Sequence, residues 1–365
     1  MILMNDFCAE SEELLKKEIE AVERVLRSGW YILGNEVRDF ESKWAAKCGA
    51  RYAIGVGNGM DAIEIGLRAL GIGRGDEVIT TPMTAFATVL AVIRAGATPV
   101  LADIDPETAL LGQESVERCI SPRTKAMLLV HLYGQVRTME RWTTFCERSG
   151  IYLLEDCAQS HAATWQGKVA GTFGVWGAYS FYPTKNLGAV GDGGAIVTNS
   201  EQIAEKARTL RNYGQSQRYH HPELGLNSRL DELQAAILNV RLGWLDIYTQ
   251  KREEIATMYN NGISNPLVQK MAQPLERNSH VYHLYVIRCT YRDRLATYLQ
   301  ERGVSTLIHY PIPVHHQSPC SNVKIDQNGL KHAEQHATRC LSIPCHPQMN
   351  INDAATVIEA INDFK

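Results

Sequence analysis

The first two thirds of the sequence alternate short apolar runs with helical patterns, and this alternation restricts the fold more than any other feature. Runs typical of buried strands occur at 51–56, 77–80, 98–102, 125–131, 151–154, 174–181 and 194–198. Several are separated by segments whose apolar residues recur at helical spacing, at 58–70, 84–95 and 139–149. Parallel strands need such crossover helices, so we expect an α/β fold whose mostly parallel, mixed sheet lies between helices on both faces.

A second, smaller α/β unit is expected after these strands. Two long helical patterns, at about 229–245 and 248–260, precede this unit, and a stretch that contains Pro and Asn follows Asn261. The elements predicted beyond this point are strands at 281–289 and 304–309 and helices at 293–301 and 354–361. We therefore divide the 365 residues into a large domain at 1–245 and a small C-terminal domain at 246–365.

Charge and composition exclude several classes of protein. A net charge of −3 argues against a dedicated nucleic-acid binder, which is usually basic. The nine cysteines include no C-x-x-C motif and are typical of free thiols in a reducing cytosol. The pairs His220–His221 and His315–His316 are not expected to hold a metal, because adjacent loop histidines rarely share one ion. Without a signal-peptide pattern or an apolar run near ~20 residues, we expect a cytoplasmic protein with no membrane partner.

A glycine-rich turn is the first candidate site. The run from Gly55 to Asp61 follows a predicted strand and opens a predicted helix. Backbone N–H groups at a helix N-terminus form a cradle for a phosphate when no side chains obstruct them. The alternative is a plain βα turn in which Asn58 caps the helix.

A carboxylate at a strand end is the second candidate. Asp156 follows the apolar run 151–154, and ligands of open α/β sheets bind beyond the carboxyl ends of the strands. The alternative is an aspartate that caps the next helix, which is the commoner use of such a residue.

A lysine among aromatic residues is the third candidate. Lys185 follows the run Ser180-Phe181-Tyr182 and enters a glycine-containing bend, and residues 174–194 carry almost no other charge. An enclosed, apolar setting disfavours the ammonium form and makes a lysine a nucleophile for carbonyls. The alternative is an ordinary surface lysine at a turn.

Together the three candidates resemble a site for pyridoxal 5'-phosphate (PLP), which needs a phosphate cradle, an acid for its ring nitrogen and a lysine for its aldehyde. The residues of the motifs and their order along the chain resemble those of the DegT/StrS family, which are PLP-dependent nucleotide-sugar aminotransferases of fold type I. The runs that carry this resemblance are VGNGMDA (56–62), GDEVIT (75–80), RAGATPV (94–100), SPRTKAMLLVHLYGQ (121–135), EDCAQSHAA (155–163), SFYPTKNLGAVGDGGAIVTN (180–199) and GLNSRLDELQAAIL (225–238).

The resemblance implies a role for each matching residue. Lys185 would be the Schiff-base lysine, Asp156 would face the pyridine nitrogen, and Gln159 would bond the phenolic oxygen. Ser180 and the backbone at Gly59 and Met60 would hold the phosphate. In this family the residue at Asn227 reaches the phosphate of the partner subunit, so a homodimer with a shared site is implied.

Two positions depart from the family pattern. Met60 stands where many members have a threonine, which removes one hydroxyl but leaves the backbone N–H. Ala85 stands where relatives often place the aromatic residue that stacks on the cofactor. The neighbouring Phe86 is therefore the candidate for this stacking role.

The expected reaction moves an amino group from L-glutamate, through the pyridoxamine form of the cofactor, to a UDP- or dTDP-linked keto sugar. The runs at 58–62, 214–234 and 309–313 are closest to members that aminate C-3, in pathways to a surface glycan or a natural product. Arg229, His309 and Tyr310 are the candidate substrate residues.

Several alternatives stay open. Amination at C-4 and a non-catalytic regulator on the same scaffold are the main ones. A sugar dehydratase would replace Lys185 with histidine, and a desulfurase or aldolase would lack the run at 225–232. The sequence does not indicate the nucleotide base or the other sugar substituents.

Overall fold

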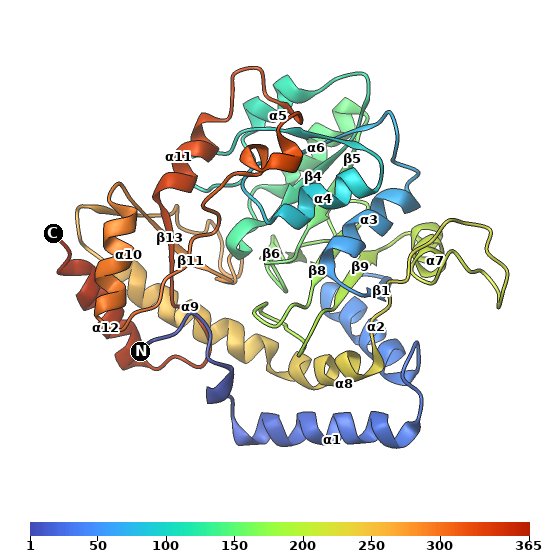
Figure 1. Cartoon of the computed structure of the whole chain (residues 1–365), viewed down its shortest axis with the longest axis horizontal. Coiled ribbons are helices and arrows are strands. Elements are labelled where there is room, and N and C mark those ends of the chain that lie inside the picture. The colour runs from blue at the N-terminus through green and yellow to red at the C-terminus, as the bar shows by residue number, and fades with distance from the viewer.

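The computed structural model describes all 365 residues and is organised around one eight-stranded sheet (Figure 1). The strand order is β1-β9-β8-β5-β4-β2-β3-β12. Only β9 runs antiparallel to its neighbours, so the sheet is mixed but mostly parallel, as predicted. The strands are β1 (Tyr52–Val56), β2 (Glu77–Thr80), β3 (Thr98–Leu101), β4 (Thr124–Val130), β5 (Tyr152–Asp156), β8 (Gly177–Ser180), β9 (Gly194–Thr198) and β12 (Lys324–Ile325).

Helices cover both faces of this sheet because its strands are apolar on both sides. Along β4, Met127 and Leu129 join one buried cluster while Ala126 and Leu128 join the other. The first cluster is closed by α2 (Asn35–Cys48), α6 (Met139–Ser149) and α8 (Glu232–Arg241), and the second by α3 (Gly59–Ala69), α4 (Phe86–Arg94) and α7 (Glu201–Leu210). The short helix α5 (Gln113–Cys119) follows β3, and a two-stranded ribbon is formed by β6 (Thr164–Trp165) and β7 (Lys168–Val169).

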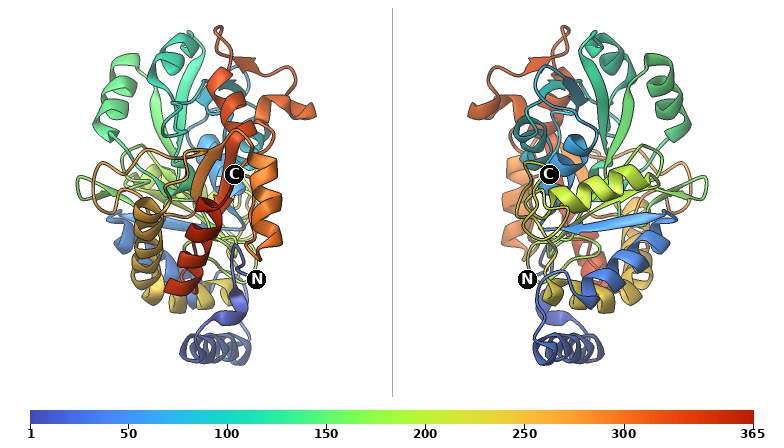
Figure 2. Two further views of the ribbon diagram at one scale, coloured as in Figure 1. Left: turned by 90° about the vertical axis from the view of Figure 1, so that its left-hand side faces the viewer. Right: turned by 90° about the vertical axis from the view of Figure 1, so that its right-hand side faces the viewer.

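The C-terminal part has its own sheet and its own buried cluster (Figure 2). The antiparallel order β10-β11-β13 packs with α9, α10 and α12, and α11 precedes β13. The elements are α9 (Leu245–Gly262), β10 (Val268–Lys270), β11 (Tyr285–Cys289), α10 (Arg292–Glu301), α11 (Lys331–Arg339), β13 (Cys340–Ile343) and α12 (Ile351–Asn362). The strand predicted at 304–309 is wrong, because Val304 and Leu307 make only isolated bridges, to Ile2 and Ser342.

The two parts of the chain exchange segments. β12, at 324–325, joins the edge of the large sheet beside β3, and Ile2 from the N-terminus packs against the C-terminal cluster. A division at residue 245 therefore describes where α9 begins but not every contact, and it stays a prediction.

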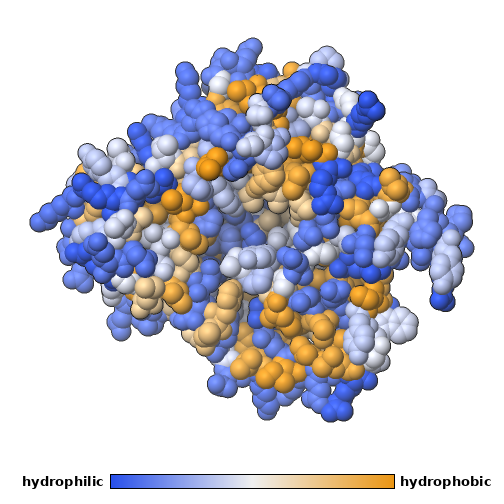
Figure 3. Space-filling view, viewed as in Figure 1, coloured by the Kyte–Doolittle hydropathy of each residue, from blue (hydrophilic) through white to orange (hydrophobic).

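The N-terminal helix α1 (Glu12–Ser28) leaves one apolar face uncovered. Ser11 caps it and Gly29 ends it with φ of 64°, in the left-handed region that favours glycine. Leu14, Ala21 and Val25 are buried, whereas Leu15, Ile19 and Leu26 are each about half exposed, at 49%, 59% and 54%. Apolar side chains also gather at the lower edge of the face in Figure 3, where Figure 1 places α1.

Candidate active site

An open cavity of about 380 Å³ lies at the carboxyl ends of β1, β4, β5 and β8. It brings together six of the residues predicted from the sequence, namely Gly59, Met60, Asp156, Gln159, Ser180 and Lys185. These residues come from three separate strand ends and the bend after β8, so the sheet topology is what assembles them. The cavity is also lined by Thr84, Ala85, Thr88, Tyr182 and Asp192.

The N-terminus of α3 forms the anion-binding side of the cavity. Asn58 caps this helix, and its Oδ1 accepts the N–H of Asp61 at 2.8 Å. Gly59 and Met60 line the cavity in the first turn, where backbone N–H groups have no partner within the helix. A Cβ at Gly59 would lie 2.6 Å from Cβ of Ser180, so only glycine lets the helix approach that hydroxyl. The helix dipole adds positive potential at the same point.

Asp156 presents a buried carboxylate with no cation in a salt bridge to it. Its Oδ2 accepts a hydrogen bond from Oγ1 of Thr88 at 2.8 Å, and its Oδ1 accepts the N–H of Ala158 at 3.1 Å. Thr84 extends this chain, because its hydroxyl lies 2.7 Å from that of Thr88. Burial raises the pKa of Asp156 above its ordinary value. A buried carboxylate in this state favours a cationic partner such as a protonated ring nitrogen.

Thr84 and Thr88 were missed as site residues in the sequence. Both belong to the stretch 84–88, in which the sequence pattern predicted only an aromatic residue that stacks on the cofactor. Their spacing of four residues at the start of a helical pattern was the available signal, because it puts two hydroxyls on one face.

Lys185 also lines the cavity, and its amine is less basic than that of an ordinary lysine. Burial lowers the pKa of Lys185 to about 8, and the attraction of Asp156 offsets only part of this effect. At pH 7 about one such lysine in ten is neutral, compared with about one in 2,500 for an unperturbed lysine. The backbone N–H of Lys185 is bonded to the carbonyl of Tyr182 at 2.8 Å, which closes the bend that carries the side chain.

Gln159 connects the cavity to the segment that carries His309 and Tyr310. Its Oε1 accepts the N–H of Tyr133 at 2.6 Å, and its Nε2 donates to the hydroxyl of Tyr310 at 3.2 Å. Nδ1 of His309 lies 2.8 Å from the hydroxyl of Ser342. Burial, reinforced by the charge of Lys185, lowers the pKa of His309 to about 4, so this imidazole is neutral at pH 7. Both predicted residues therefore lie beside the cavity without being part of its wall.

Three other predicted residues lie outside the cavity of their own chain. Phe86 is the first residue of α4, and its side chain packs against an apolar cluster that includes Met83 and Val89, so the geometry does not support the stacking role expected for it. Asn227 is exposed. The guanidinium of Arg229 donates to Oδ1 of Asn212 at 3.1 Å and lies over the ring of Tyr213.

Comparison with known proteins decides the family. A sequence model of the DegT/DnrJ/EryC1/StrS aminotransferase family matches residues 12–362. The chain belongs to this family. The resemblance inferred from the motifs is thereby confirmed, and the protein is a PLP-dependent aminotransferase of fold type I.

Relatives of this aminotransferase match it along nearly its whole length. A dTDP-3-amino-3,6-dideoxy-alpha-D-galactopyranose transaminase of Aneurinibacillus thermoaerophilus is 46% identical, over 96% of each chain. A protein of Geobacillus stearothermophilus named as a pleiotropic regulatory protein is 42% identical, over 99% of this chain and 98% of the relative. The crystal structure of DesV from Streptomyces venezuelae superposes with a TM-score of 0.95 at 42% identity, covering 99% of this chain and 98% of DesV.

The residues of the cavity fit PLP. The cradle at Gly59 suits a phosphate, the uncompensated carboxylate of Asp156 suits a protonated pyridine nitrogen, and Lys185 supplies an amine of lowered pKa. When bound, PLP supplies an aldehyde that accepts amines and a ring that withdraws electrons. A single chain of the aminotransferase supplies little positive charge to the cavity, because Lys185 is the only basic residue in its lining.

Proposed function

We propose that this aminotransferase transfers the amino group of L-glutamate to the C-3 ketone of a dTDP- or UDP-linked keto sugar. The observation that carries the proposal is the lysine of lowered pKa that faces a buried aspartate across a cavity open to large ligands. Support for C-3 comes from relatives named as 3-amino-sugar transaminases, including one from Streptomyces venezuelae at 42% identity. A relative at 39% identity is named as a UDP-2-acetamido-2-deoxy-3-oxo-D-glucuronate aminotransferase.

Lys185 is the proposed proton carrier. With PLP bound, Nζ of Lys185 would take a proton from the α-carbon of the amino donor and would later return it as a general acid. The reverse transfer serves the keto sugar, so one group acts as base and then as acid. A pKa near 8 suits both duties, because neither protonation state is rare near neutral pH.

The remaining roles follow from what each group can donate or accept. The N–H groups of Gly59 and Met60, with the hydroxyl of Ser180, are proposed to hold the phosphate. The carboxylate of Asp156 would accept a hydrogen bond from the protonated ring nitrogen, and Nε2 of Gln159, whose second hydrogen is not used by Tyr310, would donate to the phenolic oxygen. His309 and Tyr310 are proposed to face the sugar from the side of the cavity.

A second copy of the chain is proposed to complete the site. The cofactor phosphate and a nucleotide diphosphate bring several negative charges to a cavity whose lining has one cation and two carboxylates, Asp156 and Asp192. Arg229 and Asn227 lie outside that cavity and are the proposed contribution of the partner. The uncovered face of α1 and the neighbouring Trp30, which is 64% exposed, supply apolar surface for such a dimer.

We also propose a cytoplasmic location. All nine cysteines are free and eight of them are buried, as in proteins kept under reducing conditions. None of the helices combines the length and the apolar character that crossing a bilayer requires.

The proposal is tested by incubating the purified protein with PLP, L-glutamate and a panel of UDP- and dTDP-linked 3-keto and 4-keto sugars. We expect mass spectrometry to show an amine only on 3-keto sugars, and none with Lys185→Ala. Products from 4-keto sugars alone would move the reaction to C-4. No product from any sugar, with no loss of cofactor absorbance on adding glutamate, would favour a regulatory protein.

A further inference from the structure

Tyr133 joins three parts of the site that are distant in sequence. It lies in the turn between β4 and α6, is 1% exposed, and has a φ of 63°, which bulky residues rarely adopt. Its N–H donates to Oε1 of Gln159 at 2.6 Å, and its hydroxyl donates to the carbonyl of His309 at 2.6 Å. The unusual backbone conformation thus accompanies a residue whose two ends both contact proposed site residues.

These contacts close a ring of hydrogen bonds. Gln159 accepts from Tyr133 and donates to the hydroxyl of Tyr310, while Tyr133 donates to the residue just before Tyr310. Because Oε1 of Gln159 is fixed on a backbone N–H, its amide cannot flip without losing that bond, and Nε2 stays directed toward Tyr310. The backbone N–H of Tyr133 therefore determines the orientation of Gln159, and the hydroxyl of Tyr133 determines the position of the peptide at 309–310.

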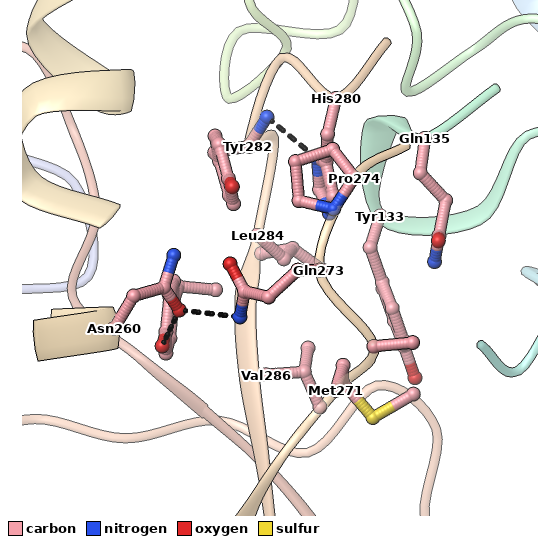
Figure 4. A pocket seen from close by; sticks show the side chains of 12 residues that line it. Tyr133, Gln135, Asn260, Met271, Gln273, Pro274, His280, Tyr282, Leu284 and Val286 are labelled. Atoms are coloured by element: carbon pink, nitrogen blue, oxygen red, sulfur yellow. Dashed lines mark hydrogen bonds between the residues drawn. The ribbon is translucent and has the colours of Figure 1, made fainter. Parts of the chain in front are cut away.

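The surroundings of the hydroxyl favour this one arrangement. Nε2 of His336 lies 2.9 Å from the hydroxyl of Tyr133, and burial lowers the pKa of His336 to about 4. A neutral imidazole with its proton on Nε2 donates to the tyrosine oxygen and leaves the tyrosine proton for the carbonyl of His309. Figure 4 shows the side chain of Tyr133 extending from its turn past Leu284 and Val286, in a small cavity between the two parts of the chain.

We infer that Tyr133 is a positioning residue for the sugar half of the reaction. Its hydroxyl holds the segment that carries His309 and Tyr310 against Gln159, whereas its backbone N–H alone orients Gln159. The inference rests on the proposed function, in which these two residues face the keto sugar. Removing the hydroxyl should therefore impair the acceptance of the sugar and spare the reaction with the amino donor.

The test compares Tyr133→Phe with Tyr259→Phe in the two half-reactions. Tyr259 is a matched control, because its buried hydroxyl donates at 2.7 Å to the carbonyl of Pro344, in the C-terminal cluster. In Tyr133→Phe we expect kcat/KM for the keto sugar to fall about tenfold, the effect of losing one buried hydrogen bond. The rate of amine uptake from glutamate and the absorbance of the bound cofactor should change less than about twofold. Tyr259→Phe should resemble the wild type.

Hydrogen exchange of the cofactor-free protein gives a readout that does not depend on activity. Amide hydrogens of residues 307–311 should exchange about 2- to 10-fold faster in Tyr133→Phe and remain unchanged in Tyr259→Phe. Tyr310→Phe removes a different hydrogen bond of the same ring and should accelerate exchange in the same segment. If the two hydroxyls act together, kcat/KM for the keto sugar in the variant with both substitutions should fall by less than the product of the two separate fold-losses.

The outcomes separate the two proposals. If the wild type accepts no keto sugar, the proposed function fails, and the exchange measurement still decides whether Tyr133 holds the segment. If the wild type accepts the sugar but Tyr133→Phe matches it in both half-reactions and in exchange, the inference about Tyr133 is overturned. An equal fall in both half-reactions would also overturn it.

Discussion

At the scale of single residues, the site depends on two buried groups of altered acidity, the carboxyl group of Asp156 with its raised pKa and the amine of Lys185 with its lowered pKa. Asp156 and Lys185 stood out because a carboxylate at a strand end and a lysine among aromatic residues are unusual in ordinary loops. Phe86 was predicted from its place in the chain, but its side chain packs against an apolar cluster that includes Met83 and Val89. Such a direction depends on tertiary contacts that no local pattern contains.

The lowered basicity of Lys185 predicts the pH dependence of cofactor attachment. Only the neutral amine attacks an aldehyde, so the rate of PLP attachment to the cofactor-free protein should rise with pH and level off above about 8. Stopped-flow absorbance at pH values between about 6 and about 11 would measure this rate. A rate that keeps rising until near the ordinary lysine value of 10.5 would show that burial does not act on Lys185 as described.

The hydroxyl of Thr88 is expected to sustain activity through Asp156. Thr88→Val removes one of the two hydrogen bonds to a buried carboxylate, so turnover should fall about 10- to 100-fold. Thr88→Ser keeps the hydroxyl and should retain most of the activity. Steady-state kinetics of both variants checks this, and equal activity in the two would mean that the hydroxyl is dispensable.

At the scale of elements, seven of the eight strands of the large sheet were predicted, because each is largely buried and consists of a short apolar run. The eighth, β12, is exposed and was not predicted. The elements that were not predicted also include α2, α5, α7, α11, β6, β7, β10 and β13. β13 is a run of four residues whose strand character depends on pairing with β11. The same dependence explains why the apolar run at 304–309 does not form a strand, since Val304 and Leu307 make only isolated bridges, to Ile2 and Ser342.

The N-terminus of α3 can be tested as the anion cradle. Gly59→Ala places a methyl group 2.6 Å from Cβ of Ser180, and the resulting shift should weaken PLP binding about tenfold or more. Gly243→Ala is the control, because a Cβ there meets nothing within 4 Å. Absorbance titration with PLP measures the affinity of both variants. An unchanged affinity in Gly59→Ala would show that the N-terminus of α3 does not hold the phosphate.

At the scale of the whole molecule, the proposed contribution of a partner subunit to the site is the part that the structure of one chain does not contain. The motif containing Asn227 and Arg229 implied a partner only through its resemblance to the family, since neither residue enters the cavity of its own chain. The division into two domains likewise followed from length and composition, which carry no information about β12 or the N-terminal segment crossing between them.

A shared site predicts complementation between two inactive variants. Lys185→Ala and Arg229→Ala should each be nearly inactive, because each dimer lacks one essential group at both sites. After unfolding and refolding an equal mixture, half of the dimers should be mixed and contain one intact site, which restores roughly a quarter of the wild-type activity. If Arg229 serves the cavity of its own chain, the mixture should stay as inactive as its components.

The most direct test of the account follows the nitrogen atom itself. The holoenzyme is given glutamate labelled with ¹⁵N at the amino group and a nucleotide-linked 3-keto sugar, and the product is examined by ¹H–¹⁵N NMR. We predict that the label appears as an amine on C-3 of the sugar in the wild type and stays in glutamate in Lys185→Ala. A label found on C-4, or no transfer by the wild type to any 3-keto sugar, would contradict the account.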